Sequence, residues 1–400
     1  MVSIGTSTVK AENMASYQID VQPSVLIWAR ESIGLTREQA AEKLHMSDID
    51  LHYLEEGVGN VSTAKLREMA KVYDRPFLAF FLQEPPPDED ALPDFRVKPT
   101  NLGRPWSFDL HRAYRRVAGQ REIALDLARL AEEPPPAIDL RLSLNDDPES
   151  AGSRVRRWLA PVDLALPLDA YEVFNRWAAA VEAKGVLVTQ VSGIEITEMR
   201  GFSIGEEAFP TIALNVRDYI RARTFSLLHE LTHVLLRSAA LCDLGEATNR
   251  VSAAVALTER FCDATAAAAL MPSSLFSAED AARRIAAAAT WSASDLTLLA
   301  DRFGVSKEAS FLRLVDLGYL RRQDYLAWKR QSPEHGGADA GQSSGGNYYR
   351  NQVRRLGRRY VAMVVDALDR GDISPLAAAD CLDMKLPNVS RLAEYIASES

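Results

Sequence analysis

Near its N-terminus the chain alternates short amphipathic helical patterns with turn signals. Thr36 is the first residue of the run TREQAAEKL, and Gln39 stands three residues after it, which is a capping-box pattern at a helix start. Ser47 and Ser62 stand in the same position before two further helical runs. Helix, short turn and helix at this spacing predict a helix-turn-helix bundle over residues 21–84.

Helical periodicity also dominates the rest of the chain. The β-branched run FPTIALNV (209–216) is the best strand candidate, and VLVTQV (186–191) is the second. The long helical pattern RDYIRARTFSLLHELTHVLLRS follows the first of these directly, and another covers about 250–271. We therefore expect a mainly α (α+β) protein with an N-terminal helix-turn-helix bundle, a domain containing a small β-sheet, and a C-terminal helical region.

Composition narrows the class of protein. Hydrophobic residues at 47% and charged residues at 25% are normal for a globular protein of 400 residues. Three cysteines argue against a disulfide framework and favour a reducing compartment. The first twenty residues have no basic and apolar leader pattern, and no run approaches the ~18 apolar residues of a membrane span. We expect a cytoplasmic protein with no membrane contact.

His229, Glu230 and His233 form an H-E-x-x-H pattern within the long helical run. Positions i and i+4 share one helix face, so both imidazoles can bind one ion while Glu230 reaches a water bound to it. Imidazole nitrogen suits zinc, and an open coordination position lowers the pKa of a bound water toward ~7. With six histidines and 55 acidic residues, about 0.01 such matches are expected by chance. The pattern predicts a zinc peptidase site with Glu230 as general base.

A catalytic zinc normally has a third protein ligand. The remaining histidines lie in other segments, so a carboxylate or a thiolate must serve. Glu259 stands 26 residues after His233, before small alanines that allow close helix packing. Asp263 lies one turn further on the same face, where a carboxylate can orient an imidazole. The alternatives to Glu259 are Asp243, Glu246 and Cys262.

With these motifs the chain resembles the ImmA/IrrE family of bacterial metallopeptidases, in the version fused behind an Xre-type helix-turn-helix domain. The matching pieces are RGFS from 200, FPTIALN from 209, FSLLHELTH from 225, the E-x-x-x-D of Glu259 and Asp263, and LMP from 270. The resemblance covers about 21–83 and 170–320. It departs from the family at Asp263, where Asn is common, and at Cys262, where Ala is common.

The resemblance implies a Glu-zincin with His229, His233 and Glu259 as zinc ligands and Glu230 as base. It also implies a substrate among repressor-type regulators, often of stress, prophage or toxin–antitoxin systems. On this view FPTIALNV (209–216) would be the edge strand that aligns an extended substrate, or else a plain internal strand.

These observations together predict six segments. They are a flexible N-terminus (1–20), an Xre-like helix-turn-helix (21–84), a proline-punctuated helical connector (85–165), an ImmA/IrrE-like zinc peptidase domain with trailing helices (166–332), a flexible linker (333–346) and a C-terminal helical segment (347–400).

The expected function is that of a zinc-dependent endopeptidase. Glu-assisted attack of a zinc-bound water on a peptide bond would cleave one specific regulatory protein, of the repressor type or from a toxin system. The alternative is a helix-turn-helix transcriptional regulator or antitoxin-like protein that uses the zincin domain as a sensor or binding platform. A homodimer is compatible with either hypothesis.

DNA binding by residues 21–84 is a separate question. This segment has seven Lys and Arg residues against ten Asp and Glu residues, and that balance opposes phosphate contact. Ser47, His52 and Lys65 are the candidate contacts to DNA, or to a protein of similar fold. The basic run YYRNQVRRLGRRY (348–360) is either a nucleic-acid contact or a solvated helix face. The tail after it has helix-turn-helix spacing, which helical packing or oligomerisation would also explain.

Overall fold

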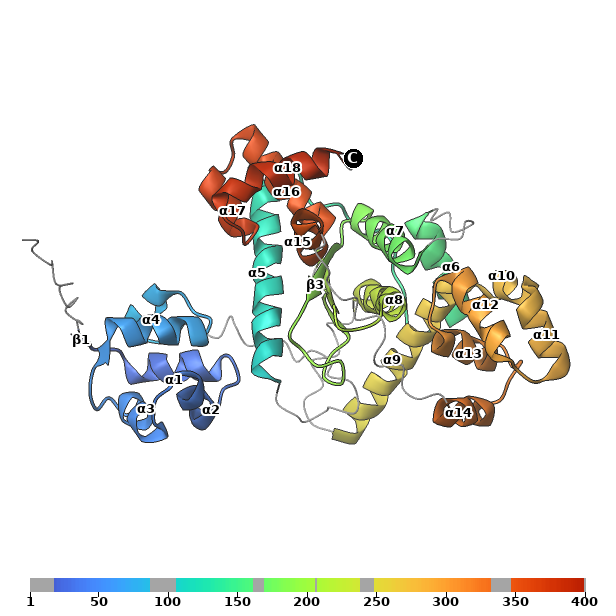
Figure 1. Ribbon diagram of the computed structural model, residues 1–400, viewed down its shortest axis with the longest axis horizontal. Helices are drawn as coiled ribbons and strands as arrows, with labels where there is room; N and C mark the ends of the chain where they lie inside the picture. The colour runs from blue at the N-terminus through green and yellow to red at the C-terminus, as the bar shows by residue number, and fades with distance from the viewer. Residues whose placement is uncertain are drawn as a thin grey trace, which may run out of the picture. The chain divides into compact units, whose positions relative to one another are not determined.

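The computed structural model describes residues 18–86, 106–160, 169–205, 207–237, 248–331 and 347–398 (Figure 1). They fall into two compact units. The first comprises the described residues up to 112, and the second comprises the described residues from 113 onward. The boundary that the sequence predicts at 333 lies outside the described residues, and the six-segment division stays a prediction.

The first unit is a small helical bundle. Its elements are β1 (Gln18–Ile19), α1 (Pro23–Glu31), α2 (Arg37–Lys43), α3 (Asp48–Glu55), β2 (Val61–Ser62), α4 (Thr63–Val72) and η1 (Phe77–Phe81). The Thr36 side chain accepts a hydrogen bond from the Gln39 backbone N–H, and the Gln39 side chain accepts one from the Thr36 backbone N–H, so the predicted capping box is present. The side chains of Ser47 and Ser62 cap α3 and α4. A buried ion pair of 2.6 Å between Arg30 and Glu55 joins α1 to α3 inside the apolar core.

The second unit is built around a three-stranded sheet and two long helices. Its first part contains α5 (Phe108–Leu130, which crosses the boundary between the units), α6 (Pro148–Leu159), α7 (Ala170–Ala183), β3 (Leu187–Val191), β4 (Gly201–Ile204), β5 (Thr211–Asn215), α8 (Ile220–Leu236) and α9 (Thr248–Leu270). Five shorter helices follow: α10 (Ser273–Ala278), α11 (Asp280–Ala288), α12 (Ala293–Phe303), α13 (Lys307–Asp316) and α14 (Arg322–Gln331).

The strand order is β3-β5-β4, with β5 parallel to β3 and antiparallel to β4. Of the two alternatives for 209–216, the edge strand is wrong and the internal strand is correct, because β5 pairs with a strand on each side and β4 is an edge. All five residues of β5 are buried, as a central strand covered on both faces requires. A run of apolar residues predicts that a strand is buried, but it does not predict which strands pair with it.

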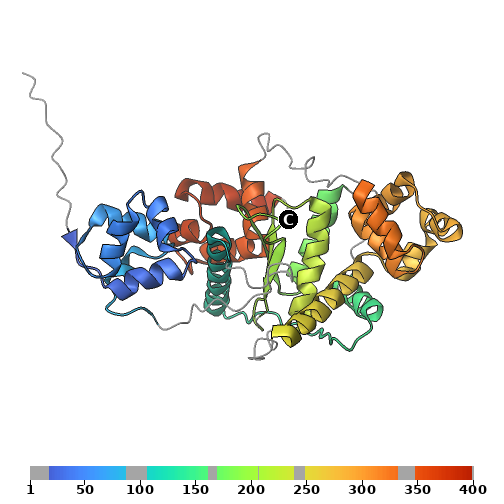
Figure 2. The same ribbon diagram turned by 90° about the horizontal axis from the view of Figure 1, so that it is seen from below.

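Helices cover both faces of the sheet. Figure 2 shows it between α5 and α8. Successive residues of a strand point to opposite faces. On β4, the ring of Phe202 lies 5.7 Å from that of Tyr114 on α5, while Ser203 points to α8, where it bonds Glu230. The sheet thus holds the edge strand β4 against α8.

The C-terminal helices cover the other edge of the sheet. They are α15 (Tyr348–Leu356), α16 (Arg358–Arg370), α17 (Pro375–Cys381), η4 (Leu386–Asn388) and α18 (Val389–Ser398). Thr189 of β3 donates a 2.7 Å hydrogen bond to the Arg355 carbonyl. Gly357 has φ of +89°, and a Cβ there would lie 2.2 Å from the Val188 carbonyl oxygen, so only glycine fits this approach. These helices share a core with α5.

The fold class is confirmed as mainly α with small sheets. Within the described ranges, no helix combines the length and the apolar character needed to cross a membrane.

Candidate metal centre

His229, Glu230 and His233 lie on α8, which is almost wholly buried. Its apolar residues face the core on several sides, and the helix ends at Arg237, whose φ is +46°. The two imidazoles are one turn apart, with ring centroids separated by 4.8 Å. Burial on this scale means that the polar atoms of these rings need partners inside the protein.

Helix α9 brings Glu259 to the same point. Glu259 Oε2 lies 3.3 Å from His229 Nε2, and Glu259 Oε1 lies 3.2 Å from His233 Nε2. The two Nε2 atoms are 3.1 Å apart. Among the described residues, these three side chains form a group whose donor atoms all lie within 4.8 Å of one another, which is close enough to hold one metal ion.

The outer nitrogen of each imidazole has its own partner on α9. Asp263 Oδ1 lies 2.8 Å from His229 Nδ1, and Cys262 Sγ lies 3.3 Å from His233 Nδ1. A carboxylate can only accept from the His229 ring, so Nδ1 carries the proton and Nε2 presents its lone pair toward Glu259 when the ring is neutral. This is the arrangement that orients a histidine for metal binding.

The electrostatics of the centre also fit a cation. Burial alone would lower the pKa of His229, but the carboxylates of Asp263 and Glu259 outweigh it and raise that pKa to about 10. Burial alone would raise the pKa of Glu259, but the two imidazoles hold it well below its usual range. Glu259 Oε1 is buried and makes no hydrogen bond. Two imidazole nitrogens and a carboxylate oxygen therefore converge on one point and attract positive charge there.

Glu230 lies beside this group and faces the edge strand. Ser203 of β4 donates a 3.0 Å hydrogen bond to Glu230 Oε2. Gly201 leaves room for the Glu230 side chain, because a Cβ at Gly201 would stand 3.3 Å from Glu230 Cγ. The carboxylate is thus held between the metal-ligand group and the edge of the sheet.

Of the alternative ligands, the structure describes Cys262. Asp243 and Glu246 lie outside the described residues, as does Cys242. Cys262 is a buried free thiol that contacts the far nitrogen of His233 and is not one of the three converging side chains.

The three candidate contact residues of the first unit have partners within that unit. Ser47 caps α3 and donates to Asp50, and His52 Nδ1 lies 3.3 Å from Arg37, which pairs with Asp48. The third, Lys65, donates to the Leu44 carbonyl and to Glu68. Their role in contacting DNA or protein stays a prediction.

One residue near the centre, Ser203, was not assigned a role from the sequence. Ser203 is close to Glu230 only because β4 pairs antiparallel with β5, and the four residues of β4 are too few to show a strand pattern. Cys262 was considered from the sequence as an alternative metal ligand, and it lies instead against His233 Nδ1, three positions after Glu259 on the same helix.

Comparison with known proteins adds a family likeness for this part of the chain. Residues 182–314, one third of the chain, match the peptidase M78 family model described as an IrrE N-terminal-like domain. The matched range contains His229, Glu230, His233 and Glu259, and it indicates a metallopeptidase-like domain.

A Mycobacterium tuberculosis transcriptional regulator matches with 19% identity over 49% of this chain and 51% of that chain, at a TM-score of 0.29. The chain thus spans about half the length of that regulator, and a TM-score this low does not indicate a shared overall fold. None of the curated proteins matches the chain.

Proposed function

We propose that the chain is a zinc-dependent endopeptidase that cleaves one specific regulatory protein of the repressor type. The observation that supports this most directly is the convergence of His229, His233 and Glu259 next to the Glu230 carboxylate. The family likeness of residues 182–314 supports the same class of chemistry.

Zinc is the metal that this donor set fits best. Two histidines and one glutamate are the protein ligands of a known class of catalytic zinc site, which keeps one coordination position open. When bound, zinc supplies a Lewis acid and an activated water. His229, His233 and Glu259 would hold it, while Asp263 and Cys262 fix the orientation of the two rings through their Nδ1 atoms.

Glu230 is the proposed general base. Its carboxylate accepts a proton from the attacking water and returns it to the nitrogen of the leaving amine. The hydrogen bond from Ser203 occupies one oxygen and restricts rotation of the carboxylate, which leaves the other oxygen for the proton.

The edge strand β4 supports a peptide as the substrate. An edge strand offers unpaired backbone groups to an extended peptide, and β4 carries Ser203 directly beside Glu230. A peptide added along this edge would lie next to the base. This moves the proposed substrate contact from β5, where the sequence placed it, to β4.

Residues 21–84 support a protein target. Three cap side chains start successive short helices here, as in an Xre-like helix-turn-helix. The segment has a surplus of acidic residues, and the cations Arg37 and Lys65 pair with carboxylates of the same unit. Such a surface suits contact with another protein better than contact with phosphates.

A Glu230→Gln variant tests the proposal. It should keep bound zinc and lose cleavage of the regulator, because the glutamine is not a base. The matched control is Glu172→Gln on α7, an exposed carboxylate remote from the centre, which should cleave at the normal rate. Cleavage by Glu230→Gln at the rate of the parent protein would refute a peptidase mechanism.

The second candidate function is a transcriptional regulator or antitoxin-like protein that uses the metal centre as a sensor. The helix-turn-helix pattern of residues 21–84 favours it. In that case Glu230→Gln would keep the full biological effect and His233→Ala would lose it together with the metal. An effect that survives both substitutions would contradict both functions.

A further inference from the structure

The C-terminal helices α16, α17 and α18 repeat the arrangement of α1, α2 and α3 at an offset of 338 residues. Helix α2 spans Arg37–Lys43, and α17 spans Pro375–Cys381, so both have seven residues and start at equivalent positions. At the same offset, Leu386, the first residue of η4, corresponds to Asp48, the first residue of α3. Helix α18 continues directly from η4. The connection between α2 and α3 therefore matches in length, whereas the connection before it has five residues after α1 and four after α16.

The backbone of the turn is the same in both places. The residue after the first helix, Leu44 or Leu382, has φ near −87° and ψ near 0°. The next residue is left-handed in both, with φ of 49° at His45 and 46° at Asp383. Met46 N bonds the Ala41 carbonyl at 3.0 Å, and the equivalent bond in the other turn has the same length. The same turn also ends α4, where Tyr73 has φ of −86°, Asp74 has φ of 50° and Arg75 N bonds the Ala70 carbonyl at 2.9 Å, so the turn alone does not relate the two segments.

The buried side chains also correspond. Each member of the following pairs is less than 9% exposed: Ala29 and Ala367, Ala40 and Ala378, Ala41 and Ala379, Leu44 and Leu382, Leu51 and Val389. Small residues in the first helix of the motif and branched apolar residues at the turn let the two helices cross closely. The C-terminal helices thus share the arrangement for which the sequence of residues 21–84 predicts a helix-turn-helix, and α18 occupies the place of the recognition helix.

The exposed residues of the two motifs differ in charge. In the first motif, residues 47–53 read SDIDLHY and contain two aspartates and no Lys or Arg. The equivalent residues 385–391 read KLPNVSR and contain Lys385 and Arg391 and no acid. Over the whole segment 347–398, eight Lys and Arg residues face six Asp and Glu residues, but six of the eight cations lie on α15 and α16, and residues 374–398 contain two cations and three acids.

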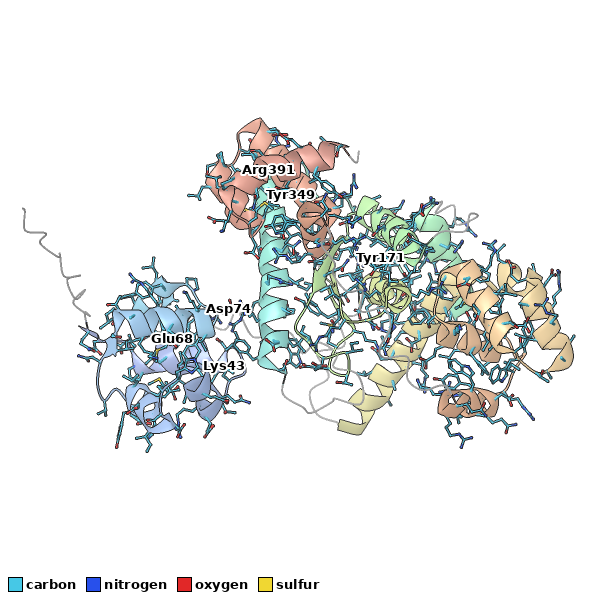
Figure 3. The ribbon with its side chains drawn as sticks, in the orientation of Figure 1. Lys43, Glu68, Asp74, Tyr171, Tyr349 and Arg391 are labelled. Carbon is cyan, nitrogen blue, oxygen red and sulfur yellow. The ribbon has the colours of Figure 1, made fainter. Side chains whose placement is uncertain are left out.

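The cations of the second motif are also available to a ligand. Lys385 and Arg391 are exposed, and within the described part of the chain neither pairs with a carboxylate. Arg391 is labelled among the red C-terminal helices in Figure 3. The acidic residue of the turn, Asp383, is paired at 2.9 Å with Arg355 of α15, which reduces its repulsion of an anion. In the first motif, by contrast, Arg37 is held by Asp48.

We propose that residues 374–398 bind double-stranded DNA, with the start of α18 in the major groove. Lys385 and Arg391 supply the positive charge that phosphate contact requires, and Arg391 can also bond a guanine edge. Asn388 and Ser390 offer groups that bond base edges, and Leu386, 46% exposed, offers an apolar contact for a thymine methyl. This DNA contact is independent of the peptidase chemistry.

Salt-dependent binding of the full chain to a labelled random-sequence duplex of about 30 base pairs tests the proposal. The double variant Lys385→Ala, Arg391→Ala should bind at least tenfold more weakly at low salt. The slope of log K against log salt should become shallower by about 2, because two phosphate contacts are lost. Both side chains are exposed, so the fold should survive, and circular dichroism checks it.

Two controls separate this site from other surfaces. Tyr53→Ala changes the position in the first motif that is equivalent to Arg391, and Arg350→Ala removes an exposed cation of α15 outside the motif. Both should bind DNA as the parent does. Absence of duplex binding by the parent would overturn the proposal, as would a loss caused by Tyr53→Ala but not by the double variant. A loss of equal size with Arg350→Ala would also overturn it, as would a protein partner that binds this face in place of DNA.

Discussion

Removal of the Asp263 carboxylate should change both the affinity of the centre for zinc and its dependence on pH. Asp263 Oδ1 accepts from His229 Nδ1 at 2.8 Å, although 63% of its own side chain is exposed. It acts on zinc binding in two opposite ways. It holds the ring in the orientation that binding needs, and it also strengthens proton binding to the same ring.

The two effects can be given magnitudes. Loss of a carboxylate that orients a histidine ligand lowers metal affinity by roughly 10- to 100-fold. With the pKa of His229 raised to about 10, the proton competes with the metal at pH 7 by a factor of about 1,000, or ~4 kcal/mol. Asp263→Ala lowers that pKa and so weakens the competition. The variant should therefore bind zinc least well, relative to the parent, at high pH.

Competition with a chromogenic zinc chelator, measured from pH 6.5 to 9.5, follows both effects. The parent affinity should rise about tenfold for each pH unit across this range, since binding releases one proton. The affinity of Asp263→Ala should level off at a lower pH. Asp263→Asn, which keeps an acceptor, should fall between them, and Arg260→Ala on the same exposed helix face should match the parent. Parallel pH curves for Asp263→Ala and the parent would refute the reasoning.

Three further predictions concern other parts of the second unit. Burial raises the pKa of Glu182 from 4.5 to about 7, so this carboxyl loses its proton at a lower pH in the unfolded chain than in the folded protein. The free energy of unfolding should therefore fall by up to roughly 3 kcal/mol as the pH rises from 4.5 to 7. Urea unfolding should show this slope in the parent and not in Glu182→Gln. Gly152→Ala should destabilise the fold by roughly 1–3 kcal/mol in the same assay, because its Cβ would lie 2.5 Å from that of Ala268 on α9. Ser203→Ala should lower kcat for the cleaved regulator by roughly 3- to 10-fold and leave KM unchanged, because it frees the Glu230 carboxylate.

Local signals in the sequence were enough to predict most helices. The capping box at Thr36 and Gln39 starts α2 as expected, and the helical patterns that contain the H-E-x-x-H residues and that cover about 250–271 correspond to α8 and α9. These features depend on residues three or four positions apart, and such residues are neighbours in any helix. The same locality places His229 and His233 on one face of α8.

Long-range pairing was harder to predict. The run around Thr211–Asn215 forms a strand, but its position in the centre of the sheet depends on β3 and β4, which its own residues do not specify. The contact between Ser203 and Glu230 depends on the same pairing. The approach of Glu259 to the histidines was anticipated from chemistry, since a third ligand was needed. The metal-binding role of these three residues remains a proposal that zinc analysis can test.

The convergence of α8 and α9 has a consequence for the lifetime of the protein. His233 and Glu259 are separated by 26 residues, so a metal held by both would close this stretch of chain as a crosslink does. A crosslink around a loop of this length lowers the conformational entropy of the unfolded chain, and this stabilises the folded state by about 3.5 kcal/mol. We expect the metal-free protein to open more often at these helices and to be degraded faster in the cell. Zinc supply would then set how much of the protein is present, as well as how active each molecule is.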